Sequence, residues 1–331
     1  MRIAVDAMGG DHGPSIVVTG AVNAAREFGI ELTLVGKSDV IESLLAKIDR
    51  TGLSIEIVNA EETIEMDEAP AMAVRRKPNS SISKALLEVK EGRAGAMVSA
   101  GHSGAVMAAS LAILGRIRGV ERPALAVVLP TLTGTTILLD LGAVTDPKPS
   151  QLVQFAYMAK VYAQVAFGKD NPTISLLSNG EEPSKGNQLV QEIFPILQAD
   201  TRLNFKGNIE GKDLLRGRSD VIVTDGFAGN IALKSMEGAV SVFSDIIREE
   251  MTRSIWRKLP AFALKPAFKA VRGRLDYAET GGAPLLGVNG VVIIAHGRSD
   301  AFAMKNAVHA GQRAAAQALP QKVREALAPT E

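Results

Sequence analysis

The sequence contains no cysteine, so neither a disulfide framework nor a cysteine-ligated metal site can form. Its four histidines are scattered and show none of the short spacings typical of metal ligands, so we expect no bound metal. It also lacks an excess of charge, because 37 Lys and Arg residues face 36 Asp and Glu residues. A net charge of +1 gives no global field that would attract nucleic acid, so we expect no nucleic-acid partner.

Long apolar runs are absent as well. No stretch reaches the roughly 18 uncharged apolar residues that a transmembrane helix requires. The N-terminus enters a strand-like run at once, without the charged and apolar regions of a signal peptide. We therefore expect a cytoplasmic protein.

Small and aliphatic side chains are abundant instead. Apolar residues make up 46% of the chain and aromatic residues only 4%, a mixture that suits buried parallel strands packed closely against helices. β-Branched runs alternate with helical patterns, which predicts a doubly wound, Rossmann-like α/β fold with a mostly parallel sheet and helices on both faces. No linker or repeat divides the chain, so we expect a single α/β domain over residues 1–331, with a basic amphipathic insertion at 251–275.

The expected strands are Ile3–Asp6, Glu31–Val35, Ser54–Val58, Ala96–Ser99, Ala124–Leu129, Thr135–Leu141, Thr173–Leu177, Arg202–Lys206, Val221–Thr224 and Val291–His296. The expected helices include Pro14–Phe28, Ser103–Arg116, Pro149–Phe167, Ser184–Leu197, Asn230–Glu250 and Asp300–Ala318.

Polar, glycine-rich loops follow several of these strands and lead into helices. The loops lie at residues 7–13, 100–104, 178–187 and 225–230. In open α/β sheets, ligands bind at the carboxyl ends of strands, and the N–H groups of helix N-termini and glycine turns bind anions. Four such loops on one chain predict a cleft suited to an anion.

Several blocks of residues carry a family resemblance. They are Ile3–Asp11, Lys148–Phe155, Phe205–Asp213, the loop at Asp225, and Leu285–Gly287 through His296-Gly297. In this order they resemble the bacterial phosphate acyltransferases of phospholipid synthesis, whose fold is similar to phosphotransacetylase and to the isopropylmalate dehydrogenase type.

The resemblance implies an enzyme that moves a long-chain acyl group from acyl carrier protein to inorganic phosphate, giving acyl phosphate. Phosphate is an adequate nucleophile for a thioester, so no covalent enzyme intermediate is required. The resemblance also implies a homodimer, and the apolar helix Ile231–Ile247 is a candidate for packing across it. We expect no cofactor beyond the phosphopantetheine of the carrier protein.

The chain departs from the family pattern in two places. It has Gly101-His102-Ser103-Gly104 where the family usually has Gly-Asn-Thr-Gly, although Ser103 keeps a hydroxyl. It has Gly142-Ala143-Val144-Thr145-Asp146 where the family commonly has Gly-Ala-Asn and then a cysteine. Without that cysteine, no mechanism here can depend on a thiolate of the enzyme.

Three residues are the candidate catalytic groups. Lys185, at a predicted helix start, can place a cation on phosphate or on the developing oxyanion. Asn230 can donate its amide to the thioester oxygen, or it can simply cap its helix. Asp225 can orient Asn230 or a neighbouring donor, or cap the turn.

The other candidates are expected to line the substrate cleft. Asp11 caps the Pro14 helix or holds a donor, because a carboxylate repels phosphate. Asn208 and Glu210 are polar cleft residues or part of a strand-end turn, and His296 shuttles a proton or simply ends its strand. The remaining predicted contacts are Gly9, Gly10, His102, Ser103, Gly104, Gly186, Asn187 and Gly229.

Two other enzyme classes compete with this interpretation. Gly101-His102-Ser103-Gly104-Ala105 imitates the G-x-S-x-G nucleophile elbow, and the order Ser103, Asp225, His296 matches a serine thioesterase or esterase. Against this class, the last glycine is an alanine and no His-Gly-Gly-Gly oxyanion motif is present. A dinucleotide-dependent dehydrogenase is disfavoured because Gly9-Gly10 does not begin a G-x-G-x-x-G motif. A binding module without activity explains the polar loops least well.

The segment 251–275 stands apart because it is basic, lacks acids and contains the only tryptophan. Three interpretations stay open: contact with an anionic membrane, docking of the acidic carrier protein, and packing in a dimer. Membrane contact would make the enzyme peripherally membrane-associated and would bring it near the membrane-bound glycerol-phosphate acyltransferase of the family's pathway. The candidate contact residues are Trp256, Arg257, Lys258, Phe262, Lys265 and Phe268.

Overall fold

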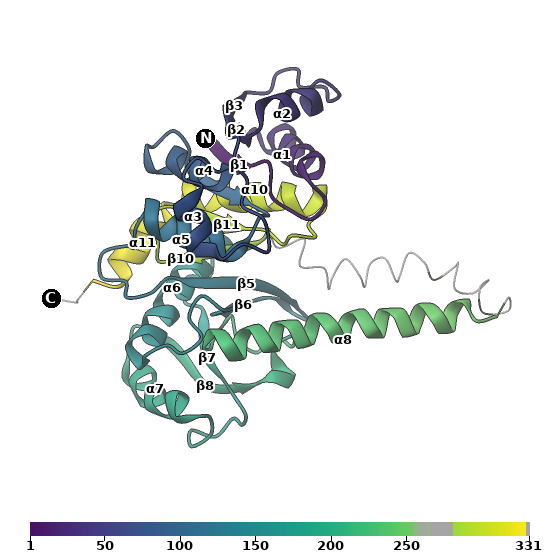
Figure 1. The fold of residues 1–331 in the computed structure, drawn as a ribbon. Coiled ribbons are helices and arrows are strands. Elements are labelled where there is room, and N and C mark those ends of the chain that lie inside the picture. Colours follow the sequence, from purple (N-terminus) through teal and green to yellow (C-terminus); the bar gives the residue numbers. More distant parts are fainter. Residues whose placement is uncertain (255–256, 258–263, 265–280, 329–331) are drawn as a thin grey trace.

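The computed structural model describes residues 1–254, 257, 264 and 281–328. It contains an 11-stranded sheet with helices packed on both faces (Figure 1). The strands are β1 (Arg2–Asp6), β2 (Glu31–Gly36), β3 (Ile55–Asn59), β4 (Ala96–Ser99), β5 (Ala124–Thr131), β6 (Gly134–Leu139), β7 (Thr173–Ser178), β8 (Asn204–Glu210), β9 (Val221–Val223), β10 (Ala283–Leu286) and β11 (Val291–Ile294). The helices are α1 (Pro14–Phe28), α2 (Ser38–Leu45), α3 (Pro70–Arg76), α4 (Ser81–Lys90), α5 (Ser103–Ile113), α6 (Pro149–Phe167), α7 (Gln188–Ala199), the 3-10 turn η1 (Gly211–Asp213), α8 (Gly226–Thr252), α10 (Ala301–Ala316) and α11 (Leu319–Ala326).

The sheet consists of two parallel blocks joined by antiparallel strands. Its order is β3-β2-β1-β4-β11-β10-β5-β6-β9-β7-β8. Strands β1 to β4 and β11 are parallel, as are β6, β9, β7 and β8, whereas β10 and β5 pair antiparallel with their neighbours. The predicted α/β class with a mostly parallel sheet is confirmed, and the antiparallel centre is a feature that the sequence pattern did not indicate.

Alternation along the strands divides the core between the two faces of the sheet. In β1, Ile3 and Val5 face the layer formed mainly by α1, α6 and α10, while Ala4 faces α3, α4 and α5. The first layer includes Phe155 on α6, the largest fully buried side chain among the described residues. Helix α8 covers the second face of the other block through Leu233 and Met236.

Several element boundaries differ from the predicted ones, and for two helices the reason is a different capping residue. The helix expected from Ser184 begins at Gln188, because Asn187 caps it by accepting from Val190 N at 3.0 Å. The helix expected from Asn230 begins at Gly226. Strand β8 ends at Glu210 rather than at Lys206, and β10 was not predicted.

Helix α8 projects away from the body of the protein (Figure 1). Only Gly226 and Gly229 are buried along it, and Phe243 is 67% exposed near its far end. Within the described residues, no helix combines the length and the apolar character needed to cross a membrane.

Gly229 and Gly238 of α8 form a matched pair for testing how the start of this helix is held. A Cβ on Gly229 would lie 2.0 Å from the carbonyl oxygen of Asp140, whereas a Cβ on Gly238 would meet nothing within 4 Å. We expect Gly229→Ala to destabilise the fold by at least about 1–3 kcal/mol through overpacking. Gly238→Ala should be neutral or stabilise by up to about 1 kcal/mol, because alanine favours helix.

Urea unfolding of the two variants checks this expectation. Equal unfolding free energies for the two would contradict the close contact between α8 and Asp140.

Candidate active site

A buried carboxylate organises the loop that follows β6. Asp140 is fully buried, and its Oδ1 accepts backbone N–H groups from Leu125, Leu141 and Ala143, while its Oδ2 accepts Val144 N at 2.7 Å. Burial raises the pKa of this carboxyl group, and the backbone donors oppose that shift. The loop at residues 141–146 is therefore built around one side chain.

This loop in turn positions the start of α8. Val144 O accepts Gly226 N at 2.9 Å, and Asp225 Oδ1 caps the helix by accepting Ala228 N at 2.7 Å. The capping role considered for Asp225 is confirmed. Asn230 is exposed one turn inside the helix, so its predicted capping role is wrong. A Cβ on Gly142 would come within 3.9 Å of Asn230 Nδ2, so the amide lies beside the backbone of this loop.

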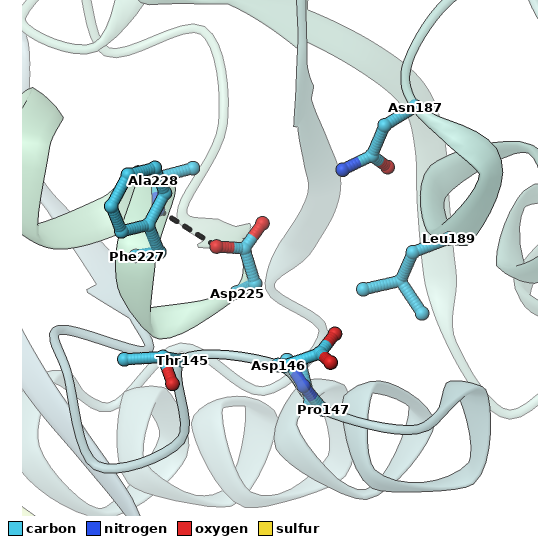
Figure 2. Close-up of a pocket in the computed structure, with 8 residues that line it drawn as sticks. All are labelled: Thr145, Asp146, Pro147, Asn187, Leu189, Asp225, Phe227 and Ala228. Atoms are coloured by element: carbon cyan, nitrogen blue, oxygen red, sulfur yellow. Dashed lines mark hydrogen bonds between the residues drawn. The ribbon is translucent and has the colours of Figure 1, made fainter.

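A pocket of about 420 Å³ opens next to this helix start. Figure 2 shows Asp146, Asp225 and the amide of Asn187 around the same space. The other lining residues are Thr145, Pro147, Leu189, Phe227 and Ala228. Carboxylates repel an anion but accept hydrogen bonds from neutral N–H and O–H groups, so the pocket suits a neutral, amide-bearing group better than phosphate. Loop 145–147 carries part of this pocket and was not predicted as a site element.

Lys185 lies in the loop before α7 and does not line this pocket. The lysine is exposed, and its methylene groups pack over Gly180. The turn is fixed by Asn179 Oδ1, which accepts Gly186 N at 2.9 Å, and by the left-handed backbone of Gly186 (φ 99°). The ammonium group therefore belongs to an exposed side chain on a hydrogen-bonded loop, while Asn187 both caps α7 and faces the pocket.

Asn208 and Glu210 lie on strand β8 rather than on a turn. Asn208 is 8% exposed and donates to the carbonyl of Glu182 at 2.9 Å, which anchors the loop that carries Lys185. Glu210 forms an ion pair of 2.7 Å with Lys212. Asn208 therefore supports the lysine loop.

In the other block, a second buried carboxylate holds the predicted glycine loops together. Asp6 Oδ2 accepts Ser99 Oγ at 2.6 Å, and Ser99 Oγ accepts Gly101 N at 3.0 Å. Burial raises the pKa of Asp6, against the hydrogen bonds it receives. A Cβ on Gly9 would lie 2.5 Å from Gly101 N, and one on Gly10 would lie 3.5 Å from Gly297 O, so these loops interlock through their backbones.

His102 caps α5, a role for which asparagine is also well suited. Its Nδ1 accepts Gly104 N at 3.2 Å at the start of α5, and Ser103 is exposed as the first residue of the helix. Gly104 packs against Pro70 at the start of α3. The exchange of the family's usual asparagine for His102 thus keeps a side-chain cap on α5.

The predicted role of Asp11 as the cap of α1 is wrong. The cap residue is Gly13, which offers no side-chain hydrogen bond. Asp11 instead donates its backbone N–H to Gly297 O at 2.7 Å. It thereby joins the first loop to the turn after β11.

His296 links the loops of this block to α8. Burial lowers the pKa of His296, and the positive charges of Lys234 and Arg298 lower it further, against Glu237 and Asp11. Its Nδ1 accepts Arg298 N at 3.1 Å. Lys234 had no assigned role, although its position four residues after Asn230 places both on one face of the helix.

The geometry opposes a serine hydrolase triad of Ser103, Asp225 and His296. In such a triad, histidine Nδ1–H donates to the acid. Here His296 Nδ1 accepts a backbone N–H, so it carries no proton for Asp225. Asp225 also follows β9, which is four positions along the sheet from β11, the strand before His296.

The fold defines a phosphotransacetylase-like α/β class. A phosphotransacetylase from Streptococcus pyogenes superposes with a TM-score of 0.63 at 22% identity, covering 95% of this chain and 94% of that one. A branched-chain phosphotransacylase from Enterococcus faecalis V583 gives a TM-score of 0.58 at 15% identity, covering 95% and 99%. These likenesses show the fold alone.

Sequence comparison identifies the family within this class. Residues 1–322 match the family model described as "Fatty acid synthesis protein". The phosphate acyltransferase of Dictyoglomus turgidum is 49% identical over 99% of this chain and 98% of its own. That of Heliobacterium modesticaldum is 51% identical over 96% and 95%. The chain belongs to the phosphate acyltransferase family and is an acyltransferase.

The electrostatic link between α8 and His296 can be measured directly. Replacing Lys234 with Gln removes a positive charge that disfavours the imidazolium, so we expect the pKa of His296 to rise. A two-dimensional NMR titration of the histidine side chains reads this shift, with His309 as the internal control. An unchanged pKa for His296 would show that α8 and the β11 loop are farther apart than described.

Proposed function

We propose that the protein transfers a long-chain acyl group from the thioester of acyl carrier protein to inorganic phosphate, giving acyl phosphate for phosphatidic acid synthesis. The family membership and the phosphotransacetylase-like fold support this reaction class. The single observation that carries the proposal is the placement of Asn230, an exposed amide fixed on α8 by the Asp140–Val144–Gly226 hydrogen bonds.

The proposed reaction is a direct displacement. A phosphate oxygen attacks the thioester carbonyl carbon, and the carbonyl oxygen becomes an oxyanion in a tetrahedral intermediate. The C–S bond then breaks, and the thiolate of the carrier leaves and takes up a proton. Holding both reactants in one site supplies much of the rate enhancement.

Three groups have distinct roles in this proposal. Asn230 Nδ2 donates to the oxyanion, which a preorganised donor stabilises. Lys185, on its ordered loop, brings a cation to phosphate or to the same oxyanion. His296 can accept the proton of the attacking hydrogen phosphate and then give it to the leaving thiolate, and burial and the charge of Lys234 lower its pKa, which favours the unprotonated imidazole at the start. No metal or cofactor is assigned a step.

The catalytic proposal predicts large losses of turnover without loss of structure. Asn230→Ala and Lys185→Ala should each lower kcat by about 10²–10³-fold, because each removes a group that acts on charge developed in the transition state. Both side chains are exposed, so urea unfolding midpoints should stay near the wild-type value. Acyl phosphate trapped with hydroxylamine measures the rate.

Ser103→Ala is the matched control, and it should retain most of the activity because no acyl-serine forms. Release of free fatty acid without phosphate, lost in Ser103→Ala, would overturn the proposal in favour of the thioesterase.

We further propose a cytoplasmic homodimer that contacts anionic membranes peripherally. The exposed apolar residues Phe243 and Ile246 of α8, 67% and 52% exposed, support a dimer that covers this helix. Membrane contact rests on the basic composition of residues 251–275, where Arg257 is described and paired with Glu250. The other candidates, Trp256, Lys258, Phe262, Lys265 and Phe268, lie outside the described residues.

The membrane proposal is tested by sedimentation with vesicles. Wild-type protein should bind phosphatidylglycerol vesicles and be released by high salt, since the attraction is partly electrostatic. Replacing Trp256 and Phe262 with Ser should abolish binding. Binding that is unaffected by these replacements, or equal on neutral phosphatidylcholine vesicles, would contradict it.

A further inference from the structure

A group of exposed cations lies on segments that meet around the first turns of α6. Arg116, Arg118 and Arg122 lie on the loop between α5 and β5, and Lys148 and Arg324 lie nearby on the ends of α6 and α11. We call these residues the basic rim: Arg116, Arg118, Arg122, Lys148 and Arg324.

Hydrogen bonds hold the loop of the rim against the first turns of α6. Glu121 N donates to Gln154 Oε1 at 2.9 Å, and Gln154 Nε2 donates to Gly119 O at 2.9 Å. Gln151 Nε2 contacts Glu121 Oε2 at 3.3 Å. The loop is therefore ordered on the helix rather than free in solvent.

A second set of bonds joins the loop to α11. Asn289 Nδ2 donates to Arg116 O at 2.7 Å, and Arg324 Nη2 donates to Asn289 Oδ1 at 3.3 Å. The cations contributed by separate segments of the chain thus belong to one surface.

The rim lies next to the pocket because α6 connects the two. Pro147 lines the pocket, and α6 begins two residues later at Pro149. Gln154 is the helix residue bonded to the loop, and it lies only about 9 Å along the helix from Lys148 at 1.5 Å per residue. The pocket and the loop of the rim therefore lie within about two turns of the same helix.

Within the described residues, no ion pair neutralises the positive charge of the rim. Over residues 1–254, 257, 264 and 281–328, no ion pair involves a residue of the rim. The nearest acid in the loop, Glu121, is held by Gln151, and Asp146 and Glu325 border the surface. This arrangement contrasts with Arg93 and Arg218, each of which is paired with two acids.

We propose that the basic rim is the docking surface for the acidic carrier protein, whose thioester arm then enters the pocket beside Asp225. The inference rests on the proposed function. An acidic partner complements the rim, while the phosphopantetheine arm is amide-bearing and complements the carboxylates of Asp146 and Asp225. The cations of the rim thus complement the acidic carrier protein, and the carboxylates of the pocket complement its amide-bearing arm.

The far end of α8 is less well placed for this docking on the same chain. The helix has 27 residues, so Thr252 lies about 40 Å from Asp225 at 1.5 Å per residue. An arm attached to a carrier docked at Thr252 would have to span that length to reach the pocket. An arm attached to a carrier docked on the loop of the rim has to span only about two helical turns of α6 to reach the pocket.

The test reverses charge on the rim without touching the pocket. The variant Arg118→Glu/Arg122→Glu changes two exposed side chains, and Lys47→Glu/Arg50→Glu makes the same charge change at the β3 edge of the sheet. Fluorescence anisotropy of labelled carrier protein measures Kd. Hydroxylamine trapping measures kcat and KM with acyl carrier protein and with acyl-pantetheine, which has the arm without the protein.

We expect the rim variant to raise Kd and KM for the carrier by about ten-fold or more, with kcat and the acyl-pantetheine reaction unchanged. The control variant should behave as wild type, and added salt should weaken carrier binding to wild type more than to the rim variant. Unchanged carrier binding in the rim variant, or equal losses in both variants, overturns the docking site.

The two proposals fail in different ways. Wild-type protein that binds the carrier through the rim but makes no acyl phosphate would overturn the proposed function and leave the docking surface standing. Wild-type protein that makes acyl phosphate but binds equally well with the rim reversed would overturn only the docking surface.

Discussion

The structure around the candidate active site depends on a single buried carboxylate, that of Asp140. It is fully buried, and it accepts N–H groups from the start of β5 and from the loop after β6. Leaving one buried donor unpaired costs about 1–3 kcal/mol, so the loop has one strongly preferred shape. That shape presents Val144 O to Gly226 and thereby sets where α8 begins. Asn230 owes its position to a residue that has no direct part in the proposed chemistry.

A buried carboxylate has the same structural role in the other block of the sheet. Asp6 is the last residue of β1 and is fixed to Ser99 at the end of β4, just as Asp140 follows β6. Each acid collects backbone donors from loops that then approach one another closely. The two parallel blocks are joined by the antiparallel strands β10 and β5. Because a long sheet twists, its successive strands are rotated relative to one another. The positive charge of Lys234 lowers the pKa of His296, so α8 lies close enough to the loop after β11 for its charge to act there.

Patterns local in the chain were predictable from the sequence, and patterns that depend on distant partners were not. The strand and helix order and the polar loops followed from periodicity. The cap of α8 was ambiguous because Asp225 and Asn230 are both good caps, and the first is selected by contacts with the distant loop after β6, through Gly226 and Gly229. In the sequence, Asp140 is only an acid after an apolar run. Its role could not be predicted because its hydrogen-bond partner Leu125 lies on another strand. The rim was equally invisible, because residues 116–122 and Arg324 meet only through the fold.

The arrangement of charge would couple the binding of an anion near α8 to the protonation of His296. Burial and the positive charges of Lys234 and Arg298 lower the pKa of His296. An anion that binds beside Lys234 partly cancels that charge and must raise the pKa of the nearby imidazole. By linkage, protonation of His296 must strengthen anion binding to the same degree. In the proposed reaction, phosphate bound near Lys234 would therefore help His296 to hold the proton that the thiolate leaving group needs.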